Sequence, residues 1–178
     1  MADKNVVFGI DRMQFIPVSS AGVDGTKVAV LGRSLSFENE TDDDQLEANN
    51  QIIDTRYFNK RASGSGEIAQ HTPAVMSLLG SGAAVTTVGT APNQTFTHTE
   101  TTAINQGFVT IQTRSYAGLG TIVETKVYWA RSAGPSFDLG TGAYAPVTFD
   151  FTTTGNATQQ LWAVISYEGT SAASIEFP

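Results

Sequence analysis

Few residues in this chain have the types and spacing that catalysis needs. The sequence holds two histidines, His71 and His98, and no cysteine. A Ser-His-Asp arrangement would require one of these histidines beside a buried carboxylate. His71 directly precedes an expected helix and His98 falls in a threonine-rich strand pattern, which are ordinary positions for polar side chains. We therefore expect no catalytic residues and no cofactor, and an enzyme is the class that the sequence favours least.

Two other stretches look like ligand sites but have the wrong pattern. The Gly-Ser-Gly at 80–82 resembles a phosphate-binding loop, yet Val85 stands where a third glycine would be and no lysine follows. The three aspartates at 42–44 could attract Ca²⁺. Three consecutive side chains do not readily converge on one ion, however, and calcium loops use an alternating acidic pattern. The sequence accordingly predicts no metal site.

The composition is typical of one globular domain rich in strands. The chain has 178 residues, of which 40% are hydrophobic and 15% charged, and 17 are glycines. A domain of this size buries roughly 70% of its unfolded surface, which allows a real core. We expect neither a signal peptide nor a membrane span, because no apolar run approaches the ~18 residues that a span needs. The net charge of −7 argues against a surface that grips DNA phosphates.

One short helix is marked at both of its ends. Thr72 suits the N-cap, a proline follows at the first helical position, and Gly80 stands just past the end. These signals predict a helix over residues 73–79. Two turns are marginal alone in water, so we expect this helix to dock on a sheet, with Leu78 and Leu79 as anchors.

The remaining segments are typical of strands joined by tight turns. Strands are predicted at 5–10, 14–18, 28–37, 94–101, 108–116, 121–129, 147–152, 161–167 and 174–177. Asp24-Gly25 predicts a hairpin, because this pair favours turns with positive φ, and two later hairpins are expected between 108 and 129 and between 147 and 167. Residues 63–66 are expected to form a glycine bend and residues 81–93 an irregular crossover, with Trp129 and Trp162 in the core. The pattern predicts a mainly β fold, an antiparallel sandwich or barrel with one flanking helix.

Residues 38–61 form the most biased segment of the chain. Residues 38–54 contain seven acidic side chains and no lysine or arginine, and three basic residues follow directly. Loops of more than about 12–15 residues in compact domains are usually functional or disordered. The segment is therefore either a solvated loop or an extended arm that reaches a neighbouring copy of the chain. In the second interpretation, the candidate interface residues are Asp42, Asp43, Asp44, Leu46, Ile52, Ile53, Arg56, Tyr57, Phe58, Lys60 and Arg61.

In this order of elements the chain resembles the tail tube proteins (major tail proteins) of long-tailed bacteriophages. The resemblance spans roughly residues 26–168. It rests on the early strands from 28 to 37, the acidic excursion, the segment RYFNKRASGSGEIA, the helix TPAVMSLLG and the later hairpins. The N-terminal segment, residues 1–25, is longer than a bare tube core needs, and no C-terminal immunoglobulin-like domain is recognisable.

The resemblance implies a single β domain whose copies form hexameric rings, stacked into a hollow tube around a tape-measure protein. It also implies other tail proteins as partners, assembly in the host cytoplasm and a place in the virion tail, where DNA crosses the lumen without specific binding. Six copies at −7 each would carry −42 formal charges, which suits a conduit for a polyanion. Two other classes stay open: another all-β virion protein of the head decoration or baseplate, and a lectin-like receptor-binding module.

Overall fold

The computed structural model describes residues 7–19, 21–48, 51–69, 72–80, 84–102, 107–117, 121–137 and 146–167. In chain order, these residues form β1 (Val7–Val18), β2 (Val28–Val30), β3 (Gly32–Ala48), β4 (Gln51–Ile68), α1 (Pro73–Leu79), β5 (Thr86–Thr90), β6 (Asn93–Thr97), β7 (Phe108–Ala117), β8 (Thr121–Phe137), β9 (Val147–Thr153) and β10 (Trp162–Tyr167). Neighbouring strands are antiparallel. The fold is mainly β with one short helix, which confirms the prediction. No helix in the described ranges has the length and apolar character to cross a membrane.

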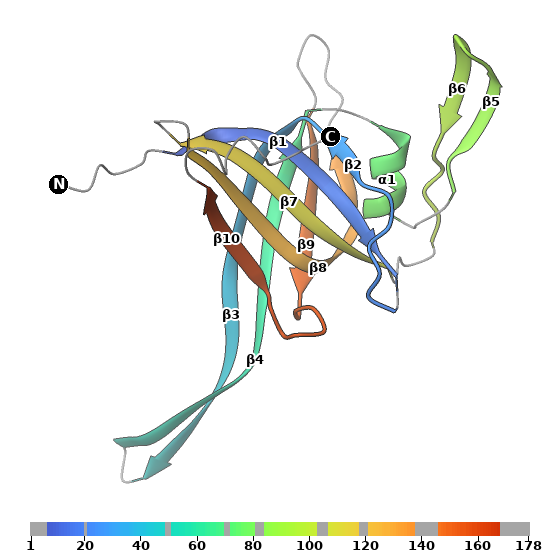
Figure 1. Cartoon of the computed structure of the whole chain (residues 1–178). Helices are drawn as coiled ribbons and strands as arrows, with labels where there is room; N and C mark the ends of the chain where they lie inside the picture. The colour runs from blue at the N-terminus through green and yellow to red at the C-terminus, as the bar shows by residue number, and fades with distance from the viewer. Residues whose placement is uncertain are drawn as a thin grey trace.

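Strand β8 belongs to two sheets (Figure 1). Its residues 121–130 pair with β7, residues 122–127 also pair with β10 on the other side, and residues 131–137 pair with β9. The first sheet thus contains β2, β1, β7, β8 and β10, and the second contains the end of β8, then β9, β4 and β3. The change falls beside Trp129, whose φ of 48° is rare for a bulky residue.

The core lies between the two sheets. Phe15 of β1 meets Phe149 of β9 edge to face, with ring centroids 5.4 Å apart and planes at 72°. Both side chains are buried within a cluster of apolar residues from both sheets and the helix. Strand β9 alternates buried and exposed residues along its whole length, as expected for a strand with one face on a core and one face in water.

Helix α1 has the predicted bounds and covers part of this core. Val75 and Leu79 are buried, and the helix packs against β8 and β1. Leu78, the other expected anchor, is only partly buried at the edge of the core. Thr72 occupies the N-cap position, but its side chain makes no capping hydrogen bond. Packing of the apolar face, and not the cap, therefore holds this helix in place.

The two glycines at 64 and 66 lie inside β4, so the expected bend at 63–66 is wrong. Gly64 is paired across the strands with Phe151, and Gly66 with Phe149. A Cβ on Gly66 would come within 3.0 Å of three atoms of the Phe149 ring. A Cβ on Gly64 would come within 2.8 Å of the Ser36 carbonyl oxygen and of the Phe151 ring. These glycines are packing positions, because aromatic rings of β9 fill the space that their side chains would take.

The early hairpin pairs as predicted, with a different turn. Strands β1 and β2 are antiparallel, with Phe15 opposite Val28. Gly22 takes a positive φ of 77° in the connection, whereas Gly25 is not among the positive-φ residues. The two strands expected at 5–10 and 14–18 are one strand, β1, with pairing irregularities between Phe8 and Arg12. The hairpin of β7 and β8 is confirmed.

Three other expectations are wrong. Strands β9 and β10 do not form a hairpin, because β9 pairs with β8 and β4 whereas β10 pairs with β8. Residues 81–93 are not an irregular crossover, since they include β5, which forms a hairpin with β6. Trp129 and Trp162 lie outside the core cluster, and Trp162 is 39% exposed. His71 and the strand expected at 174–177 lie outside the described residues.

Candidate self-assembly interface

The arm is a β hairpin that extends beyond the body of the domain (Figure 1). Strands β3 and β4 pair from Gly32 opposite Ile68 to Ala48 opposite Gln51. Strand β9 covers β4 only from residue 62 onward. Residues 40–48 and 51–61, called the arm from here on, therefore form a two-stranded ribbon that no third strand of the described ranges joins. The biased segment is a paired ribbon and not a loop.

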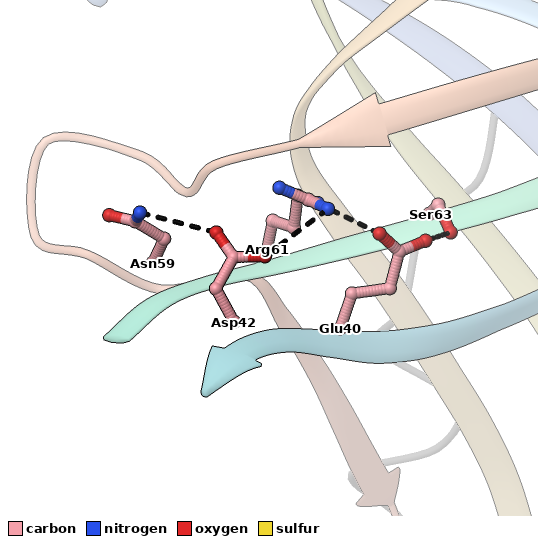
Figure 2. A network of polar contacts seen from close by, with 5 residues as sticks. All are labelled: Glu40, Asp42, Asn59, Arg61 and Ser63. Carbon is pink, nitrogen blue, oxygen red and sulfur yellow. Dashed lines mark hydrogen bonds and ion pairs between the residues drawn. The ribbon is translucent and has the colours of Figure 1, made fainter. Parts of the chain in front are cut away.

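A network of polar side chains marks the root of the arm, where β4 leaves β9 (Figure 2). Arg61 Nε donates to Glu40 Oε2 at 2.8 Å, and Arg61 Nη2 lies 3.6 Å from Asp42 Oδ1. Asn59 Nδ2 donates to the other oxygen of Asp42 at 3.2 Å, and the Ser63 hydroxyl donates to Glu40 Oε1. Figure 2 shows the five side chains in a row, so that the two carboxylates join β3 to β4.

The network sits on a β-bulge. Glu40 is opposite Arg61, but the next pair is Asp42 and Phe58, so β4 carries more residues than β3 between the two pairs. Asn59, inside this interval, has a φ of 51°. A bulge bends the strand and increases the local twist of a ribbon. The root network therefore fixes the ribbon at the point where its direction changes.

Hydrogen bonds at the root stabilise the charged forms of its groups. The hydroxyl of Ser63, followed by the guanidinium of Arg61, lowers the pKa of Glu40 below its ordinary value of 4.5. The hydrogen bond to Glu40, with the charge of Asp42, raises the pKa of Arg61. Exposed ion pairs of this kind contribute little to folding stability. We expect them to influence the direction of the arm more than the stability of the fold.

The expected interface residues all lie on the arm. Asp42 and Arg61 belong to the root network. Tyr57 is 72% exposed and Phe58 48% exposed on the free ribbon. Exposed polar residues surround them: Asp43, Asp44, Arg56 and Lys60. The side chains of Leu46, Ile52 and Ile53 lie outside what the structure describes, although all three residues belong to the paired strands.

The two aromatic side chains of the arm lie on opposite faces. Tyr57 is opposite Asp43 and Phe58 is opposite Asp42, and consecutive residues of a strand point to opposite sides. Aromatic side chains are enriched at protein–protein contacts because they bury a large area. The arm thus presents one exposed aromatic side chain on each of its faces.

Sequence reasoning missed Glu40, Asn59 and Ser63 as members of the root network. Asn59 gave a usable signal, because asparagine tolerates a left-handed backbone and is typical of bulges and turns. Glu40 and Ser63 gave none, since their contact depends on the exact register of β3 against β4.

An open groove of about 650 Å³ lies next to the arm root, over β3, β4, β9 and the end of β8. Its lining is mixed: serine and threonine side chains, the charged Glu38, Asp150 and Arg131, and the aromatic Phe37 and Phe151. His98 is not among the lining residues; its Nε2 lies 3.0 Å from Glu100 Oε2. In the described ranges, no group of three or more His, Asp or Glu side chains could hold a metal ion. The groove thus offers both apolar and hydrogen-bonding groups to another surface.

No protein-family model and no curated protein matches the chain. A function therefore has to be inferred from its own residues and their geometry.

Proposed function

We propose that the protein is a structural virion subunit that assembles into stacked rings, with six copies per ring, and forms the tail tube of a long-tailed bacteriophage. The observation that carries this proposal is the arm. A two-stranded ribbon builds no core of its own and is marginal in water. Its exposed Tyr57 and Phe58 are accounted for when another copy of the chain covers them.

The rest of the molecule supports the same proposal. The two-sheet body and single covering helix fit the small β domain of a tube wall. The net charge of −7 per copy would give the ring an acidic character, so DNA would pass during ejection without phosphate contacts to slow it. The tape-measure protein and other tail proteins would be its partners in the virion.

An arm-shortened variant tests the proposal. Asp42 and Phe58 are opposite in register, so Asn-Gly in place of residues 43–57 would close the hairpin at this pair with a tight turn. Because the removed residues lie beyond the body, we expect an unchanged thermal unfolding midpoint. Negative-stain electron microscopy should show tubes for the wild type and none for the variant.

A charge-matched control separates the length of the arm from its charge. The shortening removes four acidic residues and one basic residue, which changes the net charge from −7 to −4. The full-length triple variant Asp43→Asn, Asp44→Asn, Glu47→Gln has the same net charge, and we expect it to form tubes. Normal tubes from the shortened variant would exclude the arm from stacking. A wild-type protein that stays monomeric at high concentration with its virion partners would refute the tail tube function.

The same micrographs distinguish the other classes. Trimers or small closed rings would indicate a head-decoration or baseplate protein. A monomer that binds glycans through an exposed aromatic platform would indicate a receptor-binding module.

A further inference from the structure

A second hairpin leaves the body on the side away from the arm. Strands β5 and β6, residues 86–97, are called the distal hairpin from here on, and Figure 1 shows them and the arm extending in opposite directions. Every residue of β5 and β6 is exposed, including Val88 at 70% and Phe96 at 54%. Within the described ranges, β5 and β6 pair only with each other. The distal hairpin thus has two free edges and two free faces.

The distal hairpin is uncharged, whereas the arm carries several charged side chains. Residues 84–97 contain no Asp, Glu, Lys or Arg, although the chain as a whole carries a net charge of −7. Natural edge strands usually carry charge, proline or a bulge that prevents pairing with other chains. Two copies of an acidic protein repel one another least where one of them has no charge. This charge pattern favours a second copy of the chain as the partner.

The arm and the distal hairpin have matching layouts. Phe96 is opposite Thr87 and Val88 is opposite Thr95, so the two apolar side chains lie on opposite faces of the distal hairpin. The arm likewise carries one aromatic side chain on each face. Two ribbons placed edge to edge would form a four-stranded sheet. Each face of this sheet would carry one apolar side chain from the arm and one from the distal hairpin. Three or more strands are what a free-standing sheet needs for stability.

We propose that the distal hairpin of one copy pairs edge to edge with the arm of the next copy. Because the two ribbons point in opposite directions, this contact is head to tail and leaves a free arm at one end and a free distal hairpin at the other. Such a contact propagates instead of closing after two copies. The inference rests on the proposed function for the stacking of rings, and it names the surface that receives the arm.

Because the chain contains no cysteine, a thiol-specific cross-linker can react only with cysteines that are introduced. Asp43→Cys, opposite Tyr57 on the arm, and Thr95→Cys, opposite Val88 on the distal hairpin, introduce thiols without removing an apolar contact. The two variants are mixed under assembly conditions and treated with a short bis-maleimide. We expect a dimer that contains one copy of each variant, and monomers when either variant is treated alone. Val23→Cys, at a side chain that is 65% exposed elsewhere, is the matched control and should give no mixed dimer with Asp43→Cys.

A charge placed on the distal hairpin provides a second readout. Val88→Asp should abolish the mixed dimer and the tubes without changing the unfolding midpoint, because Val88 makes no contact with the core. Val23→Asp should change neither. A Thr95→Cys product that links two distal hairpins, or tubes without the mixed dimer, would overturn the inference while leaving the tail tube function in place. The mixed dimer in soluble oligomers that never form tubes would support the inference and refute the tube.

Discussion

Replacing Gly64 or Gly66 by alanine should destabilise the fold before it affects assembly. At Gly64 the new Cβ meets backbone, because the Ser36 carbonyl oxygen belongs to the neighbouring strand. Overpacking of a core costs about 1–3 kcal/mol. Replacing a glycine in a strand by alanine otherwise stabilises the folded state by about 0.5–1 kcal/mol, because glycine loses more conformational entropy on folding. A backbone atom cannot easily move aside, so the overpacking cost should lie near the upper end of its range. After the gain from removing glycine is subtracted, we expect Gly64→Ala to lower the free energy of unfolding by about 2 kcal/mol.

Gly66→Ala should cost less, about 1 kcal/mol, because all three close atoms belong to the ring of Phe149, which can shift slightly against Phe15. In a chain of 178 residues, 1 kcal/mol corresponds to about 2–4 °C in the unfolding midpoint. Thermal unfolding followed by circular dichroism, with urea unfolding for the free energies, measures both effects. Ser65→Ala is the matched control, since Ser65 is exposed between the two glycines.

A double variant identifies the cause of the loss. Phe149→Leu removes the ring that the new Cβ meets, so Gly66→Ala should cost less in its presence, with a coupling of at least about 0.5 kcal/mol. If Gly64→Ala unfolds like the wild type while its tubes are malformed, these glycines act as a hinge and the packing explanation is wrong.

Three further predictions concern single side chains. Thr72→Val should leave the unfolding midpoint unchanged or raise it, because the buried Thr72 hydroxyl has no hydrogen-bond partner. If the hydroxyl did cap the helix, the substitution would instead lower the free energy of unfolding by about 1 kcal/mol. The hydrogen bond to Glu124 raises the pKa of Tyr167 above 10.0, so this bond is kept below pH 10 and lost as the pH rises through the folded pKa. Phenolate absorbance should show a tyrosine that ionises above pH 10, and Tyr167→Phe should remove that step. Arg61→Ala should change the spin-label distance between arm and body without shifting the unfolding midpoint. Acidification of the wild type should change the same distance, because the lowered pKa of Glu40 keeps the root network intact above pH 4.5 and weakens it as the pH falls through the folded pKa.

Local signals predicted α1 and the strands with clear alternation, but they did not predict β5 or the full lengths of β3, β4 and β8. The bounds of α1 follow from Thr72, Pro73 and Gly80, which act within one or two turns of the chain. Strands such as β9 follow from alternation over a few residues. These signals depend on neighbours in the sequence, so no knowledge of the tertiary structure was needed.

Pairing between distant strands could not be predicted. Strand β10 follows β9 through a turn, yet it pairs with β8. The part of β8 before Trp129 has β7 on one side only, so β10 can pair with residues 122–127 on the other side. Gly64 and Gly66 indicated a bend, since glycine is typical of turns. Only the position of Phe149 and Phe151 on the adjacent strand identifies them as packing positions.

For the candidate interface, composition located the arm and its exposed aromatic residues. The root network could not be predicted from the sequence, because the hydrogen bond between Glu40 and Arg61 depends on the pairing of β3 with β4 and on its register.

The strand order determines how a pull on the arm would spread through the body. On one side, β4 passes tension through its hydrogen bonds to β9, then β8, β7 and β1. On the other side, β3 continues through Leu31 into β2, which is paired with β1. The first path runs through hydrogen bonds between strands alone, and the second runs along the chain from β3 to β2 and then through the hydrogen bonds between β2 and β1, where the two paths meet. Tension along a tube would therefore enter each subunit by two routes at once, so that no single strand pair bears all of it.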